Sequence, residues 1–314
     1  MPFLVKSQDI HFSNNGIIPT FINPANTGAF LGSIRASSVY RDQFSSFIEN
    51  PYRSVIVSVD SPVAFGFKEN HWVGVGLQLY NDRAGDVALV RNGYGLGAAY
   101  HIGLDNDFRS VVTLGLNYGN IKSNLDEGSA RFGNQAAELV NLSNYGNTQS
   151  NISVGVRFKT EFGKSSIFEA GFSTQRVTTS RAIRDTLNGL ERRMNFTALL
   201  NTQLSKKIRL TPEFYFSKSS NFTNTSLHIF PEFAFGNKNN FLFRPGVGMR
   251  FGDAMIMHLG GMYKGWRVNL SYDMTVSSAS VYNNNNGGFE IGVQRIFTIY
   301  KKPKKKLKLI CPRL

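Results

Sequence analysis

The residues of this chain that could do chemistry are spread out rather than gathered. A zinc site needs three or four ligands close together, and the histidines show no pair at metal-ligand spacing and none near the single cysteine, Cys311. The many Ser, Asp and Glu residues stand in no nucleophile-elbow or paired-carboxylate arrangement. We therefore expect no enzyme, no metal and no cofactor. The histidines are His11, His71, His101, His228 and His258.

Two patterns come closest to a catalytic or nucleotide site. A hydrolase built on a membrane barrel would need a Ser and a His paired on its outer wall, and His101, near the end of an expected strand, is the one loose candidate. The run from Gly93 to Gly97, Gly-Tyr-Gly-Leu-Gly, superficially resembles a phosphate loop. It lies within an alternating segment and no helix follows it, so we interpret its glycines as small residues that face a lumen.

Polar residues or glycine alternate with apolar ones along segments of roughly ten residues between Val111 and Phe297. In residues 266–275, Trp, Val, Leu, Tyr and Met alternate with Arg, Asn, Ser, Asp and Thr, and residues 112–119 and 241–251 behave similarly. A soluble sandwich would have to expose the apolar face or bury the charges. A transmembrane β-barrel avoids both costs because lipid-facing and lumen-facing side chains alternate along each strand.

The sequence therefore predicts an all-β fold, an antiparallel outer-membrane β-barrel. The links after even-numbered strands are mostly tight and those after odd-numbered strands mostly longer, with residues 61–71 and 252–254 as exceptions. In outer-membrane barrels the short links face the periplasm, so both termini are expected there. The fourteen expected strands are 30–40, 53–60, 72–81, 89–102, 108–119, 151–160, 166–177, 192–204, 208–217, 225–236, 241–251, 255–264, 266–277 and 288–298.

Charges of both signs fall on the expected lumen face. Mixed signs most often mean cross-strand ion pairs inside a filled barrel, and less often a selective pore. The residues are Arg157, Lys159, Glu169, Arg209, Glu213, Glu232, Arg244, Arg250, Arg267, Asp273 and Glu290.

Composition agrees with a barrel. There is no run of about 18 apolar residues that could span a membrane as a helix. The 26 Phe and 12 Tyr suit an outward apolar band edged by aromatic girdles. Membrane lipid is thus an expected partner.

The two ends are expected to differ from the barrel, which we place at residues 29–298. Residues 1–28 form an N-terminal periplasmic segment, of which 1–7 could be the remnant of a signal peptide. Residues 9–28 are too apolar for a solvated leader, so we expect them to be ordered and to enter the barrel mouth from the periplasmic side. Residues 299–314 form a basic periplasmic tail with six Lys and one Arg and no acid. No recognition helix accompanies it, so no nucleic acid is expected.

A set of short motifs, in this order along the chain, resembles the PorP/SprF family of the Bacteroidetes type IX secretion and gliding motility systems. The motifs are an Asn-Pro-Ala turn followed by Gly, a Tyr-Arg-x-Gln element, Ser-Val-Asp, Ser-Tyr-Asp, Phe-Glu-Ile and a terminal Cys-Pro-Arg. The departures are mild, for example Phe44 where Trp is common. The residues that carry the resemblance are Asn23, Pro24, Ala25, Gly28, Tyr40, Arg41, Gln43, Asp60, Tyr272, Asp273, Glu290, Cys311, Pro312 and Arg313.

The resemblance implies a non-enzymatic outer-membrane barrel that supports secretion and surface anchoring of a large adhesin by docking its C-terminal domain. It also implies contact with periplasmic or outer-membrane components of the secretion and gliding machinery. The long links at 120–150 and 178–191 are the expected docking surface, because long irregular loops are usually functional.

Two alternatives stay open. The same strand pattern permits an outer-membrane channel or small-solute transporter, which would need a continuous water path where an anchor can be plugged. Cys311 could be a free structural thiol or part of a periplasmic contact.

Overall fold

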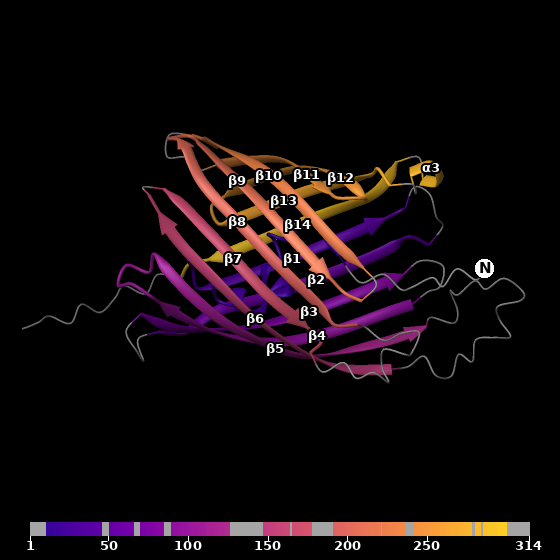
Figure 1. The fold of residues 1–314 in the computed structure, drawn as a ribbon, viewed down its shortest axis with the longest axis horizontal. Coiled ribbons are helices and arrows are strands. Elements are labelled where there is room, and N and C mark those ends of the chain that lie inside the picture. Colours follow the sequence, from indigo (N-terminus) through magenta and orange to yellow (C-terminus); the bar gives the residue numbers. More distant parts are fainter. Residues whose placement is uncertain are drawn as a thin grey trace, which may run out of the picture.

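A closed barrel of antiparallel strands makes up most of the chain (Figure 1). The computed structural model describes residues 11–45, 50–65, 70–84, 89–125, 147–163, 165–177, 191–220, 222–236, 241–277, 280–283 and 285–299. Each strand pairs with its neighbours in sequence, and β1 also pairs with β14 over Ile34–Gln43, which closes the sheet. The predicted fold class and the fourteen strands are confirmed.

The observed strands overlap all fourteen expected ranges. Strands β5 and β6 extend beyond the expected ranges at their facing ends, where the strands continue although their outward residues become polar and the apolar alternation is lost. The strands are β1 (Ile34–Gln43), β2 (Tyr52–Phe65), β3 (His71–Ala84), β4 (Leu89–Gly103), β5 (Ser110–Leu125), β6 (Asn147–Phe162), β7 (Ser166–Gln175), β8 (Arg193–Ser205), β9 (Ile208–Lys218), β10 (Thr223–Phe235), β11 (Phe241–Arg250), β12 (Ala254–Tyr263), β13 (Trp266–Thr275) and β14 (Asn286–Phe297).

The outer face of the barrel is apolar, as a bilayer requires. On β3, for example, Val75, Leu77 and Leu79 are 41–50% exposed, whereas polar side chains line the inside. Aromatic side chains form a girdle at the edge where even-numbered strands end. These are Phe108, Phe162, Phe235, Phe241, Tyr263, Trp266 and Phe297.

The two edges of the barrel differ, and we name them by their links. The turn rim carries the links after even-numbered strands, such as 206–207 and 264–265. The loop rim carries the links after odd-numbered strands, including 126–146 and 176–192. The expected long link at 61–71 is short, because β2 extends to Phe65.

The barrel lumen is occupied by the chain's own N-terminal part. Residues 11–28, which we call the lumen segment, include the one-turn helix α1 (Pro19–Ile22) and the 3-10 turn η1 (Pro24–Asn26). Residues 29–33 then lead into β1. A further short helix, α3 (Ser280–Asn283), lies in the link before β14. No helix in the described part of the chain is long and apolar enough to cross a membrane.

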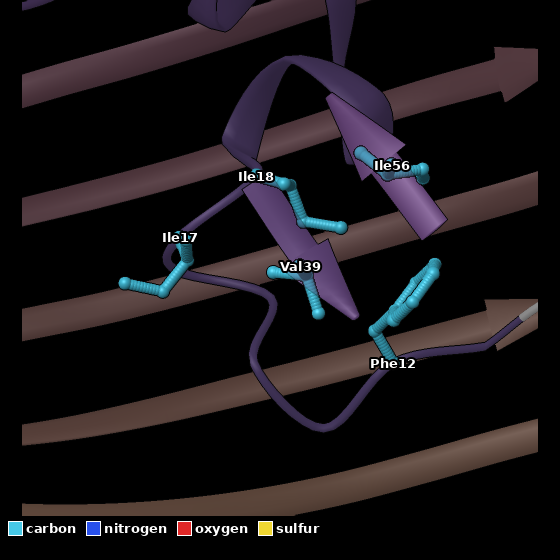
Figure 2. Close-up of a cluster of buried hydrophobic side chains, with 5 residues drawn as sticks. All are labelled: Phe12, Ile17, Ile18, Val39 and Ile56. Carbon is cyan, nitrogen blue, oxygen red and sulfur yellow. The ribbon is translucent and has the colours of Figure 1, made fainter. Parts of the chain in front are cut away.

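An apolar cluster in the lumen packs the segment against the wall. Figure 2 shows Phe12, Ile17 and Ile18 of the lumen segment next to Val39 of β1 and Ile56 of β2. All five side chains are at most 3% exposed. Fully burying one such side chain contributes about 1.5–3 kcal/mol. The cluster therefore holds the segment to the first two strands.

Candidate functional site

The lumen segment runs along the barrel from one rim to the other. His11 lies 3.5 Å from Arg41, near the end of β1, and its ring is 6.0 Å from that of Phe222 in a loop-rim link. At the other end, Gly28 contacts Asp60 of β2 at the turn rim. The expectation of an ordered segment inside the barrel is confirmed for residues 11–28. The segment extends through the whole lumen, beyond the barrel mouth at which it was expected to enter.

The first and last described residues consequently lie at opposite rims. His11 is at the loop rim, whereas the N–H of Ile299 donates to Ser33 at the turn rim. The expected placement of both termini concerns residues 1–10 and 300–314, which are outside the described residues.

A charge cluster anchors the segment near the loop rim. Arg41 binds Asp273 at 2.9 Å and also contacts Glu290, while Arg250 binds the same Asp273 oxygen at 2.6 Å. The Ser13 hydroxyl donates to Asp273 at 2.8 Å, and the Ser13 N–H donates to Glu290 at 2.7 Å. All four charged residues are at most 3% exposed. Such buried charges are tolerated only when they are paired and hydrogen-bonded.

The neighbouring segment residues complete this anchor. The Asn14 N–H donates to the second Glu290 oxygen at 2.9 Å, and its side chain donates to Ser271 at 2.9 Å.

The Asn-Pro-Ala turn lies in the middle of the lumen. The Asn23 side chain donates to the carbonyls of Val156 and Phe172, at 2.9 and 3.3 Å, and accepts from the N–H of Ala25 at 2.9 Å. Asn23 is 1% exposed. The wall beside the turn is built from glycine: a Cβ at Gly115 would come closer than 3.0 Å to the backbone of Ala25. Close approach of the two backbones explains glycine here.

We expect Gly115→Ala to displace the Asn-Pro-Ala turn from the wall. The added Cβ meets the backbone of Ala25, which cannot move aside as a flexible side chain can. The variant should insert as a barrel but lose the lumen segment, residues 11–28, to added protease faster than the parent chain. Gly261→Ala is the matched control, since its added Cβ would meet nothing nearer than the end of the Phe241 ring at 3.3 Å. Equal protease sensitivity of Gly115→Ala and Gly261→Ala would contradict the close packing of Gly115 against the turn.

A second ionic contact fixes the segment at the turn rim. The Gly28 N–H donates to Asp60 at 2.7 Å, and Arg35 pairs with the same carboxylate at 2.7 Å. Arg35 also donates to the carbonyl of Asn26 at 2.8 Å. Gly28 has a φ of +71°, in the left-handed region that favours glycine, so the chain can turn there toward β1.

Between these anchors the wall binds the main chain of the segment. Donor side chains from six strands reach carbonyl oxygens along its length. Because these donors bind carbonyl oxygens and not side chains, they recognise the path of the segment's backbone. The pairs are Arg267 to Gly16 (3.1 Å), Gln294 to Ile17 (3.0 Å), Gln175 to Phe21 (2.5 Å), Ser173 and Asn195 to Ile22 (2.7 and 3.2 Å), His101 to Thr27 (2.9 Å) and Trp72 to Gly28 (3.3 Å).

The expected ion pairs across the lumen are confirmed. Arg244 binds Glu213 at 2.5 Å and Glu232 at 2.9 Å, and Arg157 binds Glu169 at 2.7 Å. These ion pairs therefore occupy the lumen together with the lumen segment.

The structure separates the family-motif residues into groups. Arg41, Asp273 and Glu290 meet in the loop-rim cluster, with Gln43 3.3 Å from Arg41. Gly28 and Asp60 meet at the turn rim, and Asn23, Pro24 and Ala25 form the central turn. The Tyr40 hydroxyl donates to Asp42 of its own strand, and that of Tyr272, 40% exposed on the outer face, donates to Asn286. Cys311, Pro312 and Arg313 lie outside the described residues.

Sequence reasoning missed the wall donors, such as Gln175, Ser173 and Gln294. Their signal was weak, since polar residues are expected at any lumen position of a barrel. His101, the loose hydrolase candidate, is fully buried in the lumen, stacked on Trp72 at 4.5 Å. Among the described residues, no three His, Cys, Asp or Glu side chains gather as a metal site would need.

A comparison with protein families connects this geometry to a secretion system. The model described as "Type IX secretion system membrane protein PorP/SprF" matches residues 4–294. The chain belongs to the PorP/SprF family. As a PorP/SprF protein with a fourteen-stranded barrel, it is an outer-membrane protein of type IX secretion, with partners in the membrane-associated secretion machinery.

Solved structures share the barrel at low sequence identity. The Ralstonia pickettii toluene transporter TbuX is 11% identical, with a TM-score of 0.51, over 90% of this chain and 94% of that one. A mutant of the TodX monoaromatic hydrocarbon channel is 8% identical, with a TM-score of 0.54, over 91% and 95%. A Pseudomonas aeruginosa FadL homologue is 10% identical, with a TM-score of 0.50, over 90% and 94%. These likenesses concern the fold alone. A search of curated proteins gave no match.

Proposed function

We propose that this PorP/SprF barrel is a non-conducting docking platform that supports the secretion and surface anchoring of a large adhesin. In this proposal the loop rim faces the cell surface and holds the adhesin's C-terminal domain. The turn rim faces the periplasm, where the family's secretion and gliding components lie.

The filled lumen is the observation that supports this role over a channel. A transporter needs a continuous water path, and here the lumen segment passes from Arg41 near the loop rim to Asp60 at the turn rim. Ion pairs such as Arg244 with Glu213 and Glu232 also occupy the lumen. A barrel with a filled lumen binds its partners at its rims and does not pass solutes through its lumen.

Replacing residues 127–145 and 179–190 with short Gly-Ser linkers should abolish adhesin display while the barrel still assembles. These two long links belong to the loop rim, and long irregular loops are usually functional. The measurement is antibody labelling of the adhesin on intact cells, with the barrel quantified in purified outer membranes. An equivalent Gly-Ser replacement of residues 237–240 at the turn rim is the control and should leave display normal. Normal adhesin display after both loop-rim replacements would reject the docking role.

The tail from Lys301 to Leu314 is proposed as a periplasmic contact with an acidic partner surface. Changing its six Lys to Gln together with Cys311→Ser should leave barrel insertion intact and reduce adhesin secretion. The affinity of the tail for the acidic partner surface should fall by a larger factor at low ionic strength, where exposed charges are less screened. Cys311→Ser alone separates the thiol from the charges. Parental secretion by the full tail variant would show that the tail is dispensable.

A further inference from the structure

The lumen segment and the barrel wall behave as two separate parts. The strand ladder is complete without the segment, because β1 pairs with β14 from Ile34↔Phe297 to Gln43↔Gly288. The described segment adds no strand to that ladder and contacts the wall through side-chain hydrogen bonds and apolar packing. The link between the parts is exposed at the turn rim, where Leu31 is 95% exposed.

The wall also has the features of a built peptide site. It supplies donors to segment carbonyls from Gly16 to Gly28, and it supplies carboxylates to segment N–H groups at both ends, Glu290 to Ser13 and Asp60 to Gly28. Groups that bind the backbone of a peptide give affinity, and pockets for particular side chains give specificity. Ile17 and Ile18, at 1% and 0% exposure, fill such apolar positions.

Asn23 is one source of specificity. Its side chain makes three hydrogen bonds, two to wall carbonyls and one that shapes the turn. Asn15, eight residues before Asn23 in the same segment, is a contrast, because its Oδ1 has no hydrogen-bond partner among the described residues. Asn23 and Asn15 therefore allow a bonded asparagine to be compared with a control asparagine in the same segment.

We propose that the lumen is a peptide-binding site, that residues 11–28 occupy it as a bound ligand, and that the same segment binds there when supplied in trans. The site selects a peptide that folds into short turns, with two adjacent apolar residues followed by an Asn-Pro turn. This inference does not depend on adhesin docking and can fail or succeed independently of it.

The test uses the full chain with a protease site inserted after Leu31. The folded barrel is cleaved in detergent, and a fluorescent peptide of residues 9–30 is added in excess. We expect the tethered segment, once cut, to exchange for one labelled peptide per barrel, read by fluorescence anisotropy, while the barrel keeps its folded mobility on a gel. The Asn23→Ala peptide should bind at least about tenfold more weakly, because it leaves wall groups without partners. The Asn15→Ala peptide should bind within about twofold of the parent.

A receptor variant completes the test. The cleaved Gly115→Ala barrel should fail to hold the parent peptide, because the added Cβ meets the backbone of Ala25. Three results would overturn the proposal: no exchange in any condition that keeps the barrel folded, unfolding of the barrel on cleavage, or equal binding of the Asn23→Ala and Asn15→Ala peptides.

Discussion

Deletion of residues 11–28 is expected to convert the closed barrel into an ion-conducting pore. The ladder does not use the segment, and a polar lumen refills with water once the segment is gone. Fourteen strands approach the roughly 16–18 strands of porins that hold an aqueous channel. Single-channel recording in planar bilayers should show steps for the deletion variant where the full chain gives none.

The matched control for this deletion keeps the length and composition of the segment but scrambles its order. It should conduct like the deletion, because the contacts of Ser13 with Glu290 and of Asn23 with the wall depend on position. Folded mobility on gels must be normal for both variants. A deletion variant that inserts but stays electrically silent would mean that the segment is not what closes the lumen.

Arg41→Met is expected to destabilise the barrel by about 3–5 kcal/mol, the usual cost of removing one partner of a buried ion pair. The change leaves Asp273 with Arg250 and the Ser13 hydroxyl, and it leaves Glu290 with the N–H donors of the segment. The free energy of unfolding is measured by urea titration in lipid vesicles, with the folded fraction read from gel mobility.

Arg53→Met is the control for the buried arginine. Arg53 also pairs with an acid, Asp42, at 3.3 Å, but its side chain is 53% exposed. Exposed pairs contribute about 0–1 kcal/mol. The double variant Arg41→Met with Glu290→Met should recover part of the loss, because it restores charge balance. Similar small effects of Arg41→Met and Arg53→Met would show that the cluster does not stabilise the fold.

The strands were predictable because their signal is local. Alternation such as that in residues 266–275 follows directly from a wall between lipid and lumen, and pairing of sequence neighbours then fixes the sheet. The ends of β5 and β6 were not predicted, because Asn120 and Lys122 face outward and remove the apolar half of the pattern.

The path of the lumen segment could not be predicted in the same way. Its contacts join residues far apart in sequence, as Ser13 with Glu290 and Asn23 with Phe172. Apolar composition indicated that the segment is buried, but no local pattern specified which carbonyl each wall side chain would bind. The mixed lumen charges predicted ion pairs correctly, yet Arg267 was found on a backbone carbonyl instead.

The unequal strand lengths give the barrel an uneven height. At about 3.3 Å per residue and a tilt near 40°, the ten residues of β11 or β13 cover about 25 Å, the thickness of the apolar band, and the sixteen of β5 or β6 about 40 Å. The outward side chains agree: those of β5 are apolar to Tyr118 and polar from Asn120.

The wall from β3 to β6, where each strand has 14–16 residues, therefore extends beyond the apolar band, while the wall from β11 to β13 ends level with the lipid headgroups. A partner that moves within the same leaflet would meet protein first on the β3–β6 side and could pass over the rim on the other. Approach to the barrel is in this sense directional, although its strands form a closed ring.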